Sequence, residues 1–549
     1  MSALEQLIVA PILLPLLTAA LMLWLGEKHR PLKARLNLLS TLVGLGLSWL
    51  LLVRVGGGQA SAIGVYLPGN WPVPFGIVLV ADRLAALMLV LTGTLACAAL
   101  TFANARWDRA GASFHALFQI QLMGLYGAFL TGDLFNLFVF FEVLLAASYG
   151  LMLHGSGRAR VSSGLHYISI NLLASSLFLI GAALIYGVTG TLNLADLAQK
   201  IPHVEAADRG LLHAGAAILA VAFLAKAGAW PLNFWLVPAY SAASAPVAAL
   251  FAIMTKVGAY AVLRMWTLLF SSEAGASAAF GDRWLVWIGL ATMFTAALSI
   301  LGAQRLERLA SLSILVSAGI LLCAFGLATP MLTAAALFYL VGSTLALAGL
   351  FLLAELVERS RSANELPLED DLDQLPTALE SLHPPPGTNL DDEQKAVVGQ
   401  VIPWTMAFLG LSFVVCALMA IGMPPLAGFV GKVALIRAVL DSGMGLDGAL
   451  FVAMLVLTGL AALFAFGRAG IQRFWTPGER PSPLLRRYEY LPIVVLLGLC
   501  ILLTIKGDAL LRYTTATAEA LHQPQRYIDA VLRANPQPGP TSLSLEVQP

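Results

Sequence analysis

The 549-residue chain carries few charges for its length. Charged residues make up 11% of it and hydrophobic residues 59%, whereas about a quarter of an ordinary soluble protein is charged. This balance excludes a water-soluble fold, and a net charge of +1 argues against nucleic-acid binding. The apolar runs are too long for a transmembrane β-barrel, in which polar and apolar residues alternate. We therefore predict an all-α polytopic membrane protein.

Fourteen apolar runs are long enough to cross a bilayer, since a helical crossing needs roughly 20 residues. In chain order they lie at 7–25, 36–54, 83–103, 113–131, 134–153, 164–187, 213–236, 246–270, 284–302, 309–327, 331–356, 403–438, 449–468 and 489–506. The first run lacks a basic flank and a cleavage site, so we expect it to remain as a helix. The four cysteines fall inside apolar runs without CxxC spacing, so we expect no disulfide and no metal site.

Basic residues between the spans indicate the orientation of the chain. The main basic clusters follow odd-numbered spans: Lys28, Arg30, Lys33 and Arg35, then Arg106 and Arg109, Arg158 and Arg160, Arg305 and Arg308, and finally Arg468, Arg473, Arg480, Arg486 and Arg487. The connector 56–75 carries no charge. Because positive connectors stay in the cytoplasm, we predict a multi-pass protein of the bacterial cytoplasmic (inner) membrane with both termini on the outer side.

Two segments outside the spans are longer than the other connectors. Residues 358–400 contain the acidic clusters 369–371 and 391–393, which indicate either a solvated cytoplasmic linker or a docking surface for a partner subunit. Residues 508–534 are amphipathic, so we expect them to lie on the outer membrane interface.

Four ionisable residues fall deep inside predicted spans. They are Glu142, Lys226, Lys256 and Lys432. An ionised side chain in hydrocarbon costs at least about 2.5–3.5 kcal/mol, so each of the four needs a partner or a water-filled cavity. A carboxylate and several lysines at mid-depth are the parts that a proton relay requires. Glu142 and Lys226 could instead form a fixed interhelical ion pair, and the other two lysines could snorkel or bind freed carbonyls.

Two of the spans contain prolines close to their lysines. Pro231 follows Lys226, and Pro424 and Pro425 precede Lys432. Proline removes a backbone hydrogen bond, so the spans 213–236 and 403–438 are expected to be broken. Interrupted helices in corresponding halves of a chain are typical of the transport site of a repeat-built transporter.

Several motifs surround these residues. They are Asp82-Arg83-Leu84, the stretch from Tyr186 to Leu197, the stretch from Lys226 to Tyr240, Ala245-Pro246, the stretch from Thr255 to Arg264, and Gly-x-Pro-Pro-x-x-Gly-Phe-x-x-Lys ending at Lys432. Across nearly its whole length the chain resembles the antiporter-like membrane subunits shared by respiratory complex I and Mrp-type cation/proton antiporters. The run from Phe234 to Ala245 looks most like the D-type subunits of bacterial Mrp (Pha) antiporters.

The resemblance implies roles for the four buried residues. Glu142 would pair with Lys226, Lys256 would link to a central polar axis, and Lys432 would exchange protons with one side. Asn233 and Gly342 stand where many relatives have histidine. The central link would therefore run through water and hydroxyl groups such as those of Tyr339, Ser343 and Thr344.

The resemblance also implies an organisation of the chain into two inverted five-helix repeats, formed by the fourth to eighth and the ninth to thirteenth spans. The predicted parts are 1–112 with three N-terminal helices, 113–270 with the first repeat, 271–357 with the start of the second repeat, 358–400 with the acidic loop, 401–470 with the rest of the second repeat, and 471–549 with the last helix and the tail.

The function implied is that of a transporter subunit and not of an enzyme. Protons would cross through the Glu/Lys relay while Na⁺, K⁺ or Li⁺ leaves the cell, with no cofactor and with Mrp-type membrane subunits of the A, B, C, E, F and G types as partners. An alternative is a proton-pumping, non-redox subunit of complex I or of a membrane-bound hydrogenase. A scaffold with inert charges is a third reading.

Overall fold

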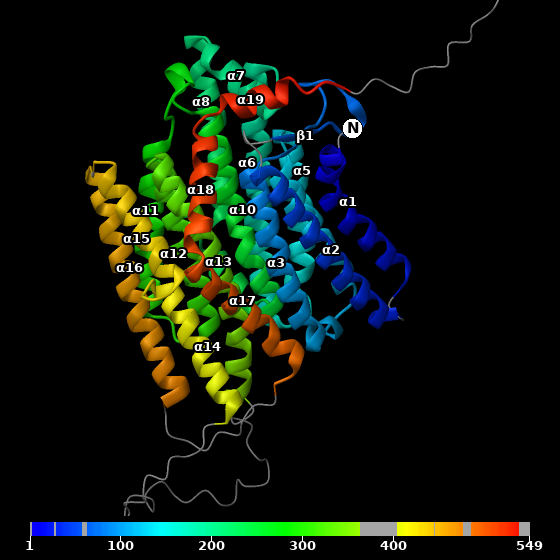
Figure 1. Ribbon diagram of the computed structural model, residues 1–549, viewed down its shortest axis with the longest axis vertical. Coiled ribbons are helices and arrows are strands. Elements are labelled where there is room, and N and C mark those ends of the chain that lie inside the picture. Colours follow the sequence, from blue (N-terminus) through cyan, green and yellow to red (C-terminus); the bar gives the residue numbers. More distant parts are fainter. Residues whose placement is uncertain are drawn as a thin grey trace, which may run out of the picture.

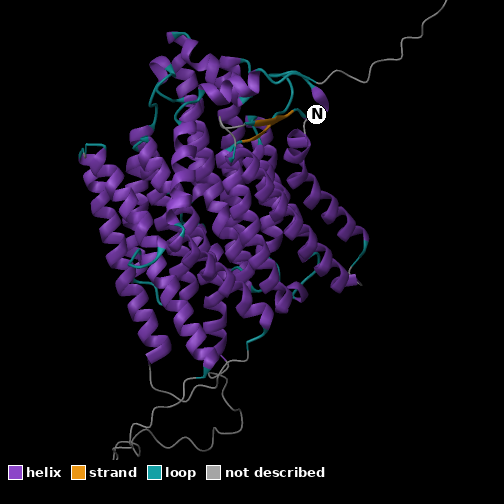
Figure 2. Ribbon diagram, in the orientation of Figure 1, coloured by secondary structure: helices purple, strands orange, loops and turns teal. Residues whose placement is uncertain are grey.

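The computed structural model describes residues 3–26, 29–57, 63–362, 403–443, 445–475 and 485–536. These residues are helical almost throughout, and Figure 2 shows one small β-ribbon beside the N-terminal end of the bundle. In that ribbon, β1 (Gly64–Tyr66) pairs antiparallel with β2 (Leu79–Ala81). The predicted all-α polytopic fold class is confirmed.

The helices stand side by side in one bundle (Figure 1). Their bounds are α1 Ala3–Trp24, α2 Arg30–Gly56, α3 Arg83–Arg106, α4 Phe114–Leu130, α5 Leu134–Met152, α6 Arg158–Thr189, α7 Leu194–Lys200, α8 Ala206–Ala227, α9 Leu236–Ala242, α10 Ala245–Leu269, α11 Asp282–Leu301, α12 Leu306–Gly326, α13 Pro330–Ser362, α14 Trp404–Ile421, α15 Ala427–Asp441, α16 Leu446–Gly470, α17 Arg487–Ile505, α18 Gly507–Leu521 and α19 Gln525–Leu532. In the described part of the chain, 13 helices are long and apolar enough to cross a membrane. The remaining predicted span is α4, whose 17 residues fall below the roughly 20 of a straight crossing, so the count of fourteen stays a prediction.

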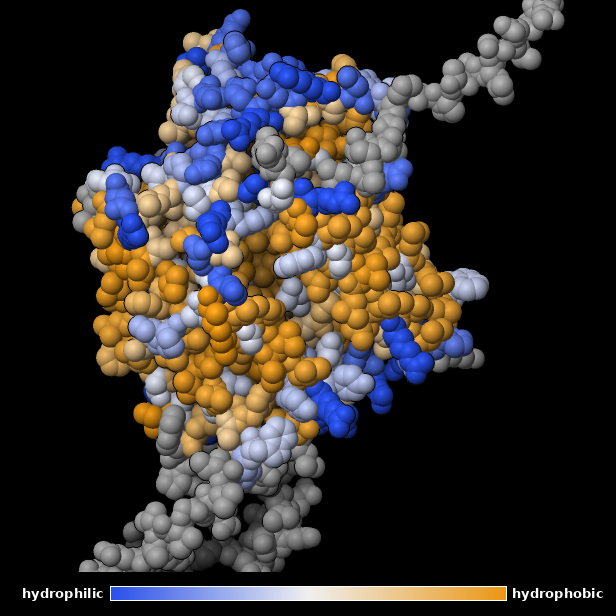
Figure 3. Space-filling view, viewed as in Figure 1, coloured by the Kyte–Doolittle hydropathy of each residue, from blue (hydrophilic) through white to orange (hydrophobic). Residues whose placement is uncertain are grey.

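The helices differ in how deeply they are buried. The apolar stretches of α10, α12 and α13 are almost entirely enclosed by protein, whereas most of α1, α2 and α17 faces outward. Figure 3 shows the outcome on one face of the molecule, where an apolar belt lies between two more hydrophilic ends. The three central helices are therefore the place where polar groups can be kept from lipid.

Two helices end in the middle of the bundle, as the prolines predict. α8 ends at Ala227 and is followed by Gly228 at φ +71°, while α14 ends at Ile421 and is followed by Gly422 at φ +78°. A left-handed residue of this kind terminates a helix and is favourable for glycine because it has no Cβ. The chain resumes as α9 and α15, so each break leaves helix-end carbonyls inside the protein.

The segment after α17 differs from the expected interfacial placement. α18 runs upright along α13, and only α19 lies across the end of the bundle near α7 (Figure 1). Thr514, Thr517, Ala518 and Leu521 form the buried face of α18. Contacts such as the hydrogen bond between Thr333 Oγ1 and His522 Nε2, 3.0 Å long, also attach this segment to the bundle. The amphipathic pattern thus faces protein, which sequence periodicity alone does not distinguish from a membrane surface.

Candidate functional site

Lys226 lies in the last turn of α8, immediately before the break. Its Nζ is 5.0 Å from the centre of the Phe141 ring on α5, a distance typical of a cation–π contact. A cavity of about 30 Å³ opens beside it, with Tyr167, Asn171 and Tyr240 among its lining residues. A cavity of this size has room for a water molecule that the ammonium, hydroxyl and amide groups of its lining can hold, so Lys226 can be hydrated inside the bundle.

Glu142 is the neighbour of Phe141 on α5 and approaches the same region. Its Oε1 atom is buried and has no hydrogen-bond partner among the described residues. The carboxylate is close enough to act electrostatically on Lys226, but no ion pair within 4.0 Å joins the two described side chains. The two predicted partners therefore lie near each other without direct contact. This arrangement differs from a fixed interhelical ion pair.

Lys256 lies on α10 with 0% of its surface exposed. Its Nζ donates a hydrogen bond of 2.6 Å to Ser317 Oγ on α12, and that hydroxyl lies 3.2 Å from Ser343 Oγ on α13. Within the described part of the chain, no carboxylate lies within 4.0 Å of this ammonium group. Burial without a counter-ion disfavours the charged form of an amine relative to the neutral form.

Lys432 lies on α15, just after the second break, and is 7% exposed. Its Nζ donates a 2.7 Å hydrogen bond to the backbone oxygen of Ile421, one of the carbonyls left at the end of α14. Gly459 on α16 packs beside this hydrogen bond, since a Cβ there would lie 3.3 Å from the Ile421 oxygen and 3.5 Å from the Lys432 Nζ. Breaking the helix therefore provides an acceptor for the lysine inside the membrane.

A second cavity, of about 20 Å³, lies beside α13 and is lined in part by Tyr339, Ser343 and Thr458. Ser343 connects it to Lys256 by way of the Ser317 hydroxyl. Met419, from the last turn of α14 before its break, also lines this cavity. The volume suffices for about one water molecule.

The α8 and α10 backbones meet closely at Gly258. A Cβ at this glycine would lie 2.5 Å from the Ala227 backbone nitrogen and 2.8 Å from the Phe223 carbonyl oxygen. No side chain fits at such a distance, so the glycine is required for the helices to approach. This contact brings the α8 backbone next to Lys226 against α10 at a point two residues from Lys256.

The hydroxyl groups predicted for the central link behave differently from one another. Tyr339 and Ser343 line this cavity, but Thr344 Oγ1 hydrogen-bonds only the Leu340 carbonyl of its own helix. Ser317, which sequence reasoning missed, makes the direct contact to Lys256. Asn233 faces a separate pocket at the end of the bundle where α12 begins.

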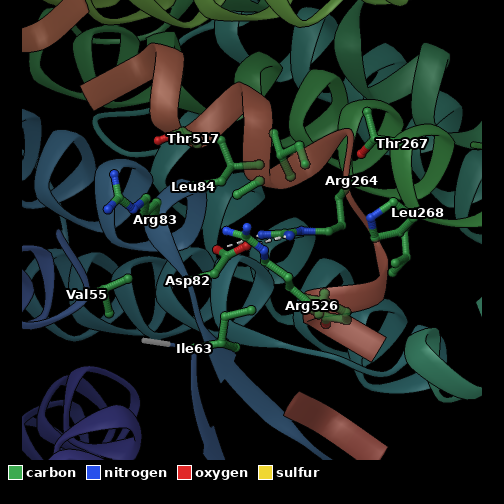
Figure 4. A pocket seen from close by; sticks show the side chains of 14 residues that line it. Val55, Ile63, Asp82, Arg83, Leu84, Arg264, Thr267, Leu268, Thr517 and Arg526 are labelled. Carbon is green, nitrogen blue, oxygen red and sulfur yellow. Dashed lines mark hydrogen bonds and ion pairs between the residues drawn. The ribbon is translucent and has the colours of Figure 1, made fainter. Parts of the chain in front are cut away.

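A buried charge pair, apart from the four predicted residues, joins distant segments of the chain. Arg264 Nη1 and Nη2 donate hydrogen bonds of 2.6 and 2.8 Å to the two oxygens of Asp82, which also caps α3 (Figure 4). The Arg264 guanidinium lies 5.4 Å from the ring centre of Tyr527 on α19. A bidentate pair of this kind fixes geometry, and here it links α3, α10 and the C-terminal helix.

Comparisons with known proteins agree with this architecture. Residues 131–460 match the family model "NADH:quinone oxidoreductase/Mrp antiporter, TM". The chain is 50% identical to a probable K⁺/H⁺ antiporter subunit of the D type from Rhizobium meliloti, over 97% of this chain and 98% of that protein. It is 33% identical to a D-type Na⁺/H⁺ antiporter subunit of Alkalihalophilus pseudofirmus, over 96% of this chain and 100% of that one.

A solved structure also matches. A chain of the Mrp complex from a Dietzia species superimposes with a TM-score of 0.79 at 26% identity, covering 97% of this chain and 100% of that one. The chain therefore belongs to the NADH:quinone oxidoreductase/Mrp antiporter family of membrane subunits, among the D-type subunits of Mrp antiporters.

Proposed function

We propose that this chain is the proton-translocating subunit of a multisubunit Na⁺(K⁺)/H⁺ antiporter. Protons pass along Glu142, Lys226, Lys256 and Lys432, and their passage is coupled to monovalent cation efflux. The observation that carries this proposal is the full burial of Lys256 against the Ser317 hydroxyl, with no carboxylate beside it among the described residues. An inert structural cation would need a counter-ion there, whereas a lysine that takes up and releases a proton does not.

The contacts of the four residues support one order of steps for the proposed relay. A proton on Lys226 is stabilised by the Glu142 carboxylate, and it moves to Lys256 when water in the cavity beside Lys226 connects the two groups. From Lys256 it passes by way of Ser317 and the hydroxyl-lined cavity to Lys432. Lys432 then releases it to one aqueous side.

The proposal also covers the surroundings of the chain. Relatives named as K⁺/H⁺ and as Na⁺/H⁺ antiporter subunits make both ions candidate substrates, and other Mrp-type membrane subunits are the expected partners. We place the basic connectors in the cytoplasm and both termini outside. The N-terminal end and α19 lie at the same end of the bundle (Figure 1), as this topology requires.

A proton-pumping subunit of complex I is the second candidate. The shared family model covers such subunits as well. The overall similarity to D-type antiporter subunits, at 50% and 33% identity over nearly the whole chain, favours the antiporter.

The test is cation-induced dissipation of ΔpH in everted vesicles that contain the assembled complex. Lys226→Ala and Glu142→Gln are expected to abolish exchange. Removing either side chain leaves the other as a buried ionisable group without an opposite charge nearby. Glu142→Asp keeps the charge on a shorter side chain and should retain part of the activity. Native gels control for assembly, and full exchange by an assembled Lys226→Ala complex would refute the relay.

A further inference from the structure

A wide pocket opens at the end of the bundle that carries the basic connectors. Its volume is about 560 Å³, which falls in the range of small-molecule sites. The walls come from the start of α6, from the break and α9, from the end of α11 and from the start of α12. We call it the basic-end pocket, and the relay described above does not use it.

The polar side of the basic-end pocket carries unneutralised positive charge. Arg305 and Arg308 both line it and are exposed. Arg305 lies 3.7 Å from Glu307, but among the described residues Arg308 has no carboxylate within 4.0 Å. Asn233 and Ser241 add amide and hydroxyl groups to the same lining.

Much of the remaining lining is apolar. Phe234, Val237, Leu312 and Leu315 line it, and Phe234 is 54% exposed. The pocket therefore offers arginines at the end of the helices and hydrocarbon contacts farther along them. An ion alone would use only the first, whereas an amphiphile with an anionic head would use both.

We infer that the basic-end pocket binds an anionic phospholipid of the adjacent leaflet. Its phosphate contacts Arg308 and Arg305, and an acyl chain packs along Phe234 and Leu312. Arginine presents a planar set of donors that matches a phosphate group, and basic pockets between transmembrane helices at the cytoplasmic side recognise anionic lipid head groups. The bound lipid would contact the segment between α8 and α9, directly after the Lys226 break.

The experiment uses the whole complex in nanodiscs with a photoactivatable phosphatidylglycerol, followed by mass-spectrometric mapping of labelled peptides. Labelling is expected in residues 233–242 and 299–315 and should be displaced by unlabelled phosphatidylglycerol but not by phosphatidylcholine. One arginine near a membrane surface contributes about 1 kcal/mol, or about fivefold in affinity. Arg308→Gln should weaken competition about fivefold, and Arg305→Gln with Arg308→Gln about 25-fold.

Two further variants separate charge from general damage. Arg308→Lys should retain most of the labelling because it keeps the charge. Arg109→Gln removes an exposed arginine from another connector that follows an odd-numbered predicted span, and it should change nothing.

Three results would overturn the inference. They are unchanged labelling in the double variant, complete displacement by millimolar inorganic phosphate, and loss of neighbouring subunits from the double variant with lipid labelling intact. The second would assign the pocket to a free anion and the third to a protein partner. Cation/proton exchange is measured separately, so failure of the proposed relay would leave this result interpretable.

Discussion

Ser317 has the most specific single contact in the proposed relay. Its hydroxyl accepts the 2.6 Å hydrogen bond from Lys256 and lies 3.2 Å from Ser343. Because all three side chains are buried, no bulk water replaces this hydroxyl if it is removed.

We therefore expect Ser317→Ala to slow exchange about tenfold or more, since a hydrogen bond to a charged group is worth about 1.5–3 kcal/mol. The matched control is Thr344→Val on α13, which removes a buried hydroxyl that bonds only its own helix. Vesicle exchange rates, normalised to assembled complex, decide between them. Equal effects of the two substitutions would show that Ser317 acts through packing and not through its hydroxyl group.

At the scale of helices, the spacing of α8 and α10 depends on Gly258. We expect Gly258→Ala to force the helices apart, lowering the melting temperature of the complex by several degrees, in line with the roughly 1–3 kcal/mol of overpacking. The rate of cation/proton exchange should fall as well, because the distance between Lys226 and Lys256 increases.

The control is Gly187→Ala on α6, where a new Cβ would meet nothing within 4 Å. Alanine is the better helix former, so this variant should melt at the same temperature or slightly higher. Thermal shift of the purified complex is the measurement. A Gly258→Ala complex as stable and active as Gly187→Ala would disprove the close approach.

The two helix breaks show how far sequence reasoning extends. Pro231 and the Pro424-Pro425 pair predict that both spans are interrupted, and both are. The end points were less accurate, because α8 already stops at Ala227 while the predicted span continues to 236. A glycine that takes a left-handed conformation, and not the proline itself, ends each helix.

Contacts between distant segments could not be predicted in the same way. Ser317 lies 61 residues from Lys256 in the sequence. Many other serines of this chain fit a helical pattern equally well as partners for that lysine. The placement of α18 against α13 likewise depends on which surface its amphipathic face meets. Periodicity identifies the buried side of a helix but not its neighbour.

For the whole molecule, the proposed orientation has a direct test. Phe75, in the connector before α3, is 87% exposed, and Arg109 lies beyond the other end of that helix. Three native cysteines are buried and Cys97 is only partly exposed, so background labelling by an impermeant maleimide should be low. Phe75→Cys should label in intact cells and Arg109→Cys only in everted vesicles. The reverse pattern would invert the topology.

The central claim is that buried lysines release and regain a proton during transport, and Lys432 tests it most directly. Arginine keeps the charge but does not deprotonate under working conditions, whereas histidine keeps a titratable group with an ordinary pKa of about 6.5. Cation-induced ΔpH dissipation is measured in everted vesicles across a range of pH, with assembly checked on native gels. The account predicts an assembled but inactive Lys432→Arg complex and partial activity of Lys432→His at lower pH. Near-normal exchange by Lys432→Arg would contradict it and remove Lys432 from the proton path.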